Sequence, residues 1–400
     1  CLAAVGICGP IVTLLSSFGT LVGIGGSIWL SMCLGQKNEK RASQILYNSF
    51  VMLVVLSICL TLGFILLKRN LIYWFGGSDA LYPYANTYLT IYTLGTFFAL
   101  MSIGLNYFIT GQGYATIAML SVCIGAITNI IFDFILIRTL KIGVSGAAIG
   151  TVVAQFISCM FVLCFLRFKS KMKLHKEELS IEKMKHIVKL GFSPFLIIAS
   201  DSIILIVMNM MLQKYGGNMG DIYISAITVA QSYFLLITGP LLGISSGTQP
   251  IFAYHFGSQN LKKIKEAFKI VISFAFLFCL IMFIISMCYS NVFVAMFTND
   301  AMTMPIADRA IKIFCLGILM MSIQYVLVDG ITGLSNVKLS LFLSLNRKLM
   351  YFGCTCLLPA FLGVSNIFYA QPVADIYASI VTIICFIKII PSYLKSHGVK

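Results

Sequence analysis

Two distant segments of this chain, residues 23–42 and 245–264, carry the same pattern of residues. The identical pairs lie 222 positions apart: Gly25 and Gly247, Gly35 and Gly257, Asn38 and Asn260. Two later landmarks repeat in the same way, Ile-Thr-Gly at 109–111 and 331–333 and Gly-Val-Ser at 143–145 and 363–365. A nearly constant offset over separate landmarks predicts two homologous halves of about 200 residues each.

Composition places both halves in a membrane. The chain is 59% hydrophobic and 10% charged, whereas roughly a quarter of an ordinary globular protein is charged. Apolar runs of about 20 residues, the length that a helix needs to cross a bilayer, recur throughout. We predict eleven such spans, at roughly 8–33, 45–67, 87–109, 116–138, 143–166, 190–213, 222–252, 268–297, 305–328, 338–361 and 367–391. The expected fold class is an all-α membrane protein with two homologous helical bundles, and a soluble enzyme is excluded.

The repeat also predicts the domain organisation. We expect an N-terminal helical lobe over 1–170, a basic cytoplasmic linker over 171–189 and a C-terminal helical lobe over 190–400. The counterpart of the span at 190–213 would lie before residue 1, so we expect a complete protein of six plus six spans. This chain then has five plus six and lacks the first helix. The alternative is an eleven-span protein with a processed start.

Positive charge indicates the orientation. Most of the 28 Lys and Arg residues follow the first span, lie in the linker, follow the segment at 257–260 or lie near the C-terminus. Because such residues concentrate on cytoplasmic loops, residue 1 is expected outside and Lys400 inside, in the cell membrane. The net charge of +15 then reflects topology and attraction to anionic lipid. The linker mixes acidic with basic residues and lacks interleaved aromatics, so no nucleic-acid partner is expected.

Two repeated lobes in a membrane chain favour transport, because a site between them can be exposed to each side in turn. The thirteen cysteines lie mostly within spans at no metal-ligand spacing, so they are expected to pack as small apolar residues. No cofactor and no resident metal centre are predicted.

Several phrases resemble the MATE (multidrug and toxic compound extrusion) family, nearest to its bacterial DinF- and MepA-like branch. They are the segment at 23–42, TNIIFDFILI at 128–137, GVSGAAIGT at 143–151, GTQPIFAYHFGSQN at 247–260, LSLNRK at 343–348 and AQPVAD at 370–375. The resemblance covers essentially the whole chain. It implies two six-helix bundles that form a V-shaped cavity, and export of cationic, lipophilic compounds in exchange for H⁺ or Na⁺. It also implies a monomer.

Asp133 is the strongest candidate for ion coupling. A carboxylate inside a membrane is costly and persists with a partner or a function. Asn129 lies one helical turn before it on the same face. The resemblance implies that Asn129, Asp133 and a Thr on the next helix, here Thr151, form an ion-binding cluster that could hold a proton or Na⁺. The family's fourth member, an Asp on the first helix, is absent with that helix. The alternative is that the three residues only make interhelical hydrogen bonds.

The second half offers further intramembrane acids. Asp201 lies in the middle of an apolar span, and Asp329 precedes Gly330 near the end of another. Some family members carry cation-binding acids on the corresponding spans, although the match is not residue for residue. Asp375, within the AQPVAD phrase, is expected to serve packing and a turn. Tyr107, Gln155 and Gln324 are candidate polar contacts in the cavity.

The sequence therefore predicts a secondary active multidrug exporter in which substrate and coupling ion compete for Asp133. One rival is a flippase for lipid-linked oligosaccharides, which should need a basic cavity for pyrophosphate. Almost all Lys and Arg lie outside the spans, with Arg347 and Lys348 the main exceptions. A channel or structural membrane subunit is a rival of another class, and its flux would not depend on a second gradient.

Overall fold

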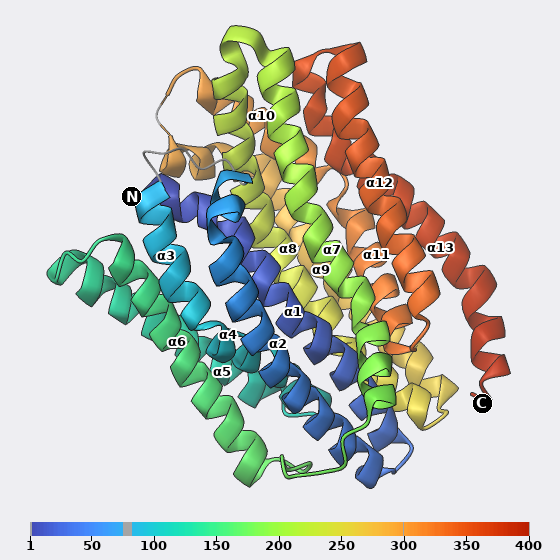
Figure 1. The fold of residues 1–400 in the computed structure, drawn as a ribbon. Helices are drawn as coiled ribbons and strands as arrows, with labels where there is room; N and C mark the ends of the chain where they lie inside the picture. Colours follow the sequence, from blue (N-terminus) through green and yellow to red (C-terminus); the bar gives the residue numbers. More distant parts are fainter. Residues whose placement is uncertain (1, 75–81, 299, 400) are drawn as a thin grey trace. The chain divides into compact units, whose positions relative to one another are not determined.

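The computed structural model describes residues 2–74, 82–298 and 300–399, and in these ranges every regular element is a helix (Figure 1). The chain divides into two compact units, residues 1–199 and 200–400. The first contains α1 (Leu2–Gly35), α2 (Glu39–Trp74), α3 (Tyr82–Leu94), α4 (Thr96–Gly111), α5 (Ala115–Asp133), η1 (Phe134–Thr139), α6 (Val144–Cys164) and η2 (Phe165–Lys169). The second contains η3 (Gly217–Met219), α8 (Gly220–Gly257), α9 (Leu261–Phe297), α10 (Thr303–Cys315), α11 (Ile318–Gly333), α12 (Val337–Leu362), η4 (Val364–Tyr369) and α13 (Ala370–Ser396).

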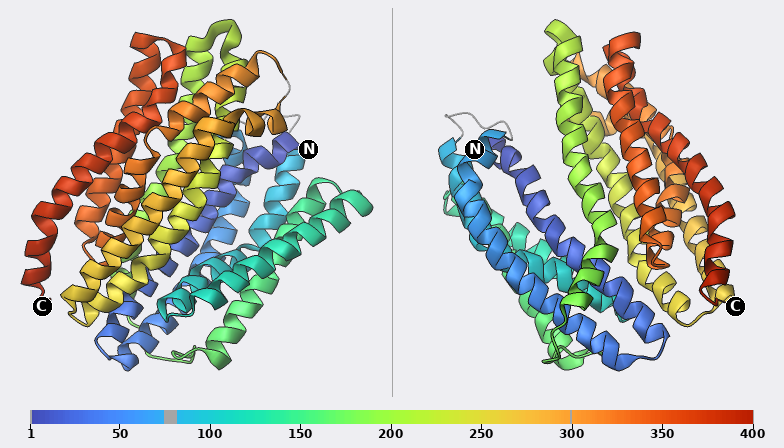
Figure 2. Two further views of the ribbon diagram at one scale, coloured as in Figure 1. Left: turned by 180° about the vertical axis from the view of Figure 1, so that it is seen from behind. Right: turned by 45° about the vertical axis from the view of Figure 1, so that its right-hand side comes forward.

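The division between the units falls inside α7 (Ile181–Gly216), which begins within the predicted linker 171–189. In the first unit α1 packs on α2 and α4, and α5 packs on α6, beside which it runs in the view from behind (Figure 2). In the second unit α8 packs on α9, α10 and α11, while α12 packs on α13. The predicted boundaries of the two lobes and the linker, at 170/171 and 189/190, stay predictions.

The predicted spans coincide with helices. By length and composition, seven helices in the described residues can cross a membrane, and two bent pairs raise the number to nine. The other two predicted runs coincide with α7 and α12, which are also continuous helices. Large apolar side chains such as Leu66, Ile130 and Ile270 are exposed, as expected of surfaces that lipid covers.

Both units bend at the same point of the repeat. The axes of α3 and α4 differ by 55° across Gly95, and those of α10 and α11 differ by 48° at a break that includes Gly317, 222 positions later. A Cβ at Gly95 would lie 2.6 Å from a methyl of Val152, and a Cβ at Gly317 would lie 2.9 Å from Cα of Pro372. Glycine therefore allows the bent pair to approach a neighbouring helix in each unit.

The loop before α2 and the loop before α9 also share a side-chain hydrogen bond and a backbone conformation. Asn38 accepts a hydrogen bond from the backbone N–H of Arg41 at 3.0 Å, and Asn260 accepts one from Lys263 at 3.0 Å. Such side chains satisfy a free N–H at a helix start. The preceding residues, Lys37 and Gln259, both have positive φ, 58° and 57°. These two loops thus share a backbone conformation as well as a sequence pattern.

Candidate ion-coupling site

The packing of α5 against α6 brings together the three residues predicted for the first half. Asn129 and Asp133 lie on one face of α5, and Thr151 lies opposite on α6. The Asn129 amide donates a hydrogen bond to the Thr151 hydroxyl at 3.5 Å, and that hydroxyl donates to the carbonyl of Ala147 at 2.9 Å. All three side chains are half-buried. The geometry thus provides a carboxylate, an amide and a hydroxyl between two helices.

Asp133 has an oxygen that is not satisfied. Its Oδ1 is buried and accepts no hydrogen bond from the described part of the chain. It lies against Gly150 of α6, where a Cβ would be only 2.5 Å away. A buried acceptor without a partner is costly. A bound proton or a small cation would remove that cost, so this oxygen is suited to reversible ion binding.

Two tyrosines of α3 complete the cluster, and the sequence analysis did not identify them. The Tyr88 hydroxyl is hydrogen-bonded to the Thr151 side chain, and Tyr88 interacts electrostatically with Asp133. Tyr92 stacks on Tyr88 with ring centroids 6.3 Å apart. The sequence does contain a pattern that could have identified them. Tyr84, Tyr88 and Tyr92 recur at every fourth residue and so lie along one helix face.

Of the three residues predicted to line the cavity, one belongs to the cluster around Asp133 and the other two, Tyr107 and Gln324, lie elsewhere. Gln155 of α6 joins the cluster, since its amide donates to the Tyr92 hydroxyl at 3.0 Å. The Tyr107 ring lies instead against α1, where a Cβ at Gly23 would be 2.6 Å from it. Gln324 of α11, in the second unit, is buried, and its Oε1 accepts no hydrogen bond from the residues that the structure describes.

The acids of the second unit have partners. Asp329 of α11 accepts a hydrogen bond from the Gln249 amide of α8 at 2.8 Å and another from Ser245. Asp201 of α7 pairs with the Lys348 ammonium of α12, and its own side chain is 57% exposed. Each acid is therefore neutralised or hydrogen-bonded across two helices.

Asp375 forms a buried ion pair, which goes beyond the packing and turn role predicted for it. It lies on α13, is fully buried and contacts Arg347 of α12 at 2.7 Å. Of Asp133, Asp201, Asp329 and Asp375, Asp133 is the one with a buried oxygen that lacks a hydrogen-bond partner in the described residues. The described residues contain no group of three or more His, Cys, Asp or Glu side chains that could hold a metal ion. A cation at Asp133 would therefore rely on neutral oxygens for its other ligands.

Comparisons with known proteins agree with this fold. The MatE family model matches residues 1–135 and 198–350. The chain is 25% identical over 382 residues to the multidrug export protein MepA of Staphylococcus haemolyticus, covering 94% of this chain and 82% of the relative. It is also 25% identical over 327 residues to that of Staphylococcus saprophyticus, covering 81% and 71%.

Two solved structures have the same fold. One is an outward-facing multidrug resistance MATE family transporter of the MOP superfamily, with a TM-score of 0.92 and 23% identity, covering 99% of this chain and 89% of that one. The other is a MOP superfamily transporter from Pyrococcus furiosus, described as having a binding pocket of reverse polarity, with a TM-score of 0.92, 22% identity and coverage of 98% and 88%. The predicted all-α class with two helical bundles is confirmed.

Proposed function

This chain belongs to the MatE family, whose members are transporters and not enzymes, and from that membership we propose that it exports cationic, lipophilic compounds by antiport with H⁺ or Na⁺. The relatives are named multidrug export proteins, which supports drug-like substrates. We place the transporter in the cell membrane as a monomer, as the family membership suggests. Its linker and C-terminus lie in the cytoplasm in this proposal, as the distribution of positive charge favours.

The observation that carries the proposal is the buried oxygen of Asp133 that accepts no hydrogen bond from the described residues. An acid that is already paired with a resident cation must first give up that partner before it binds a proton or a substrate, whereas Asp133 has no such partner to displace among the described residues. Asp133 can hold a proton, Na⁺ or a cationic substrate, but not two of them at once. This competition couples the downhill entry of the ion to the uphill exit of the substrate.

The neighbouring side chains have supporting roles in this proposal. Asn129 and Thr151 offer neutral oxygens beside the carboxylate, as a bound Na⁺ requires, and their mutual hydrogen bond fixes their positions. Tyr88, Tyr92 and Gln155 extend the polar wall on α3 and α6. No chemical bond is made or broken, so no cofactor enters the cycle.

A second cation site in the C-terminal unit, at Asp201 and Asp329, is the next candidate. Asp201 favours it because more than half of its side chain is exposed although it lies on a long apolar helix. A cationic substrate could there replace the Lys348 ammonium. Asp329 is held by Gln249 and is a weaker candidate, since its hydrogen bonds would have to be given up.

The flippase alternative finds less support. A flippase cavity for pyrophosphate requires unpaired positive charge within the membrane-spanning helices. Arg347 and Lys348 are both buried, and each is paired with an acid of the same unit. The two cations are therefore compensated within the protein.

Transport in proteoliposomes tests the proposal. The wild type should move a fluorescent lipophilic cation when a proton or a sodium gradient is imposed, and the effective gradient identifies the ion. Asp133→Asn should abolish the response to that gradient. Asp300→Asn is the matched control, because Asp300 is exposed and accepts a hydrogen bond from the backbone N–H of Thr303 at the start of α10, a role that Asn also performs.

Two results would argue against the proposal. Unchanged gradient-driven transport by Asp133→Asn would place coupling elsewhere. Failure of the wild type to move cations under either gradient would direct attention to lipid-linked substrates, tested as translocation of a fluorescent lipid-linked oligosaccharide in the same vesicles.

A further inference from the structure

A separate cavity opens in the first unit where α1 ends, α2 begins and α7 begins. Its volume is about 310 Å³, and it is lined by Trp29, Arg41, Ser180, Glu182, Lys183, Lys185, His186 and Lys189. This volume is at the lower end of the range of ligand pockets, roughly 300–1,000 Å³. None of these residues belongs to the cluster around Asp133. The ion coupling proposed for that cluster therefore does not account for the cavity.

The cavity is rich in positive charge that no ion pair among the described residues compensates. Arg41, Lys183, Lys185 and Lys189 contribute four cations, against the single carboxylate of Glu182. In the part of the chain that the structure describes, none of these five side chains takes part in an ion pair. The preference for positive charge on the cytoplasmic side explains its sign. It does not explain why the charges surround a hollow.

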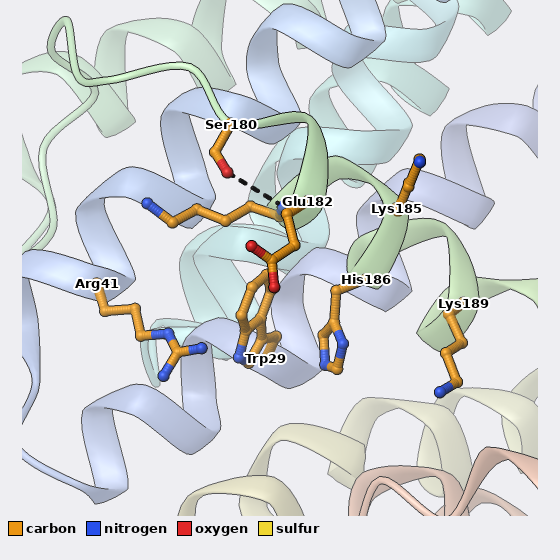
Figure 3. A pocket seen from close by; sticks show the side chains of 8 residues that line it. Trp29, Arg41, Ser180, Glu182, Lys185, His186 and Lys189 are labelled. Carbon is orange, nitrogen blue, oxygen red and sulfur yellow. Dashed lines mark hydrogen bonds between the residues drawn. The ribbon is translucent and has the colours of Figure 1, made fainter.

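The cavity also has a fixed aromatic floor. Trp29 is only 5% exposed, and the Arg41 guanidinium lies over its ring at 5.1 Å. The His186 ring lies 4.4 Å from it at an angle of 51°. Figure 3 shows Arg41, Glu182 and His186 grouped around Trp29. Stacking holds the guanidinium in place, which lowers the entropic cost of binding an anion.

The hydrogen-bonding groups suit a phosphate. Arginine presents a planar fork of N–H donors that matches phosphate oxygens, and lysines add point charges. Burial, together with Lys189 and Arg41, lowers the pKa of His186, which favours the neutral ring with a single N–H. The Lys183 ammonium instead donates a hydrogen bond to Gln44 of α2 at 2.6 Å, and it adds charge to the cavity wall.

We propose that this cavity binds a phosphate group, carried either by an anionic lipid headgroup or by a free phosphate compound, with Arg41 and Lys189 as its principal contacts. Glu182 opposes that binding and tunes its strength. The site joins the end of α1 to the start of α7, and its existence does not depend on which substrate is exported.

The chain has a built-in probe for the test, because it contains only two tryptophans. In a Trp74→Phe background Trp29 is the sole tryptophan. The protein in neutral detergent is titrated with phosphatidylglycerol, phosphatidylcholine and inorganic phosphate while Trp29 fluorescence is followed. Retention of each lipid in native mass spectrometry gives a second readout that does not depend on fluorescence.

Phosphatidylglycerol should change the fluorescence saturably and phosphatidylcholine should not. Arg41→Gln with Lys189→Gln should weaken binding by about tenfold or more, given the attraction of each basic residue to anionic lipid. Glu182→Gln should strengthen it. The matched control, Lys262→Gln with Lys265→Gln, removes two exposed lysines from α9 and should leave binding unchanged.

The outcomes separate the two sources of phosphate. A response to inorganic phosphate but not to phosphatidylglycerol assigns the site to free phosphate compounds. The proposal is overturned if neither ligand binds, or if the control variant loses as much binding as Arg41→Gln with Lys189→Gln. That second result would mean attraction to general surface charge rather than a site.

Discussion

The guanidinium of Arg347 donates through Nε and Nη2 to the same oxygen of Asp375, at 2.8 and 2.7 Å. The other carboxylate oxygen accepts a hydrogen bond from Gln371 at 2.9 Å. Arg347 also donates to the Tyr325 hydroxyl at 3.2 Å, and its guanidinium lies 5.1 Å above the Tyr325 ring. This buried pair fastens α12 to α13 with its hydrogen bonds largely satisfied.

Breaking this pair should destabilise the C-terminal unit strongly. Asp375→Asn leaves the buried Arg347 without a counter-charge, a situation that costs about 3–5 kcal/mol. Arg347→Met should cost a similar amount because it leaves Asp375 unpaired. The measurement is thermal or denaturant unfolding of the purified protein in detergent. The double variant should lose much less than the two single losses combined, whereas simple additivity would show that the residues do not interact.

Gly150 should be required for coupling although it carries no charge. A Cβ at this position would lie 2.5 Å from Oδ1 of Asp133, so Gly150→Ala must displace the carboxylate. We expect gradient-driven transport to fall by about ten- to hundredfold, as small displacements of a functional group can cause. Gly125→Ala on the facing helix is the control, since its Cβ would meet Ser158 at an ordinary 3.4 Å. Equal transport by both variants would show that coupling does not depend on the position of the Asp133 carboxylate.

Lys348 should compete with cationic substrates for Asp201. Lys348→Met removes the resident ammonium, and because Asp201 is 57% exposed, the gain in affinity should be modest. Half-exposed ion pairs are worth up to about 1 kcal/mol, which corresponds to about fivefold. Equilibrium binding of a fluorescent cation measures the effect, and Asp201→Asn should move the affinity in the opposite direction. Weaker cation binding by Lys348→Met would exclude this role.

The sequence predicted the cluster of Asn129, Asp133 and Thr151 because two of the three lie one turn apart on one helix. A family resemblance supplied the third. The sequence did not predict that Arg347 pairs with Asp375, 28 positions away, or that Lys348 pairs with Asp201, 147 positions away. Those pairs depend on how each helix is rotated about its axis and on which helices are neighbours. A single sequence fixes neither.

The sequence also did not predict the bends between α3 and α4 and between α10 and α11. The run at 87–109 reads as one continuous apolar span, yet the helix breaks at Gly95. Hydropathy is averaged over many residues, so it registers that a segment crosses the membrane but not its change of direction. The repeat contains the missing information, because Gly95 and Gly317 occupy equivalent positions in the two halves.

His186 should titrate below its ordinary pKa of 6.5, because burial, then Lys189 and then Arg41, lowers it, while Glu182 partly opposes them. It precedes the predicted span at 190–213, so it can exchange protons with the aqueous phase. Lys189→Gln should raise this pKa, and Glu182→Gln should lower it further. NMR of the histidine-labelled protein measures the values, with His186→Gln assigning one of four signals.

The same shift sets the sign of a stability effect. Because the pKa of His186 is lower in the folded protein, the unfolded chain binds more protons near pH 6.5. The stability contributed by a neutral His186 is therefore fully present above pH 6.5. It is lost as the pH falls from 6.5 through the lower pKa of the folded protein. His186→Gln should lose less stability than the wild type between pH 7 and pH 5.5. A pKa at or above 6.5 that Lys189→Gln does not move would contradict the buried, positively charged surroundings described for this ring.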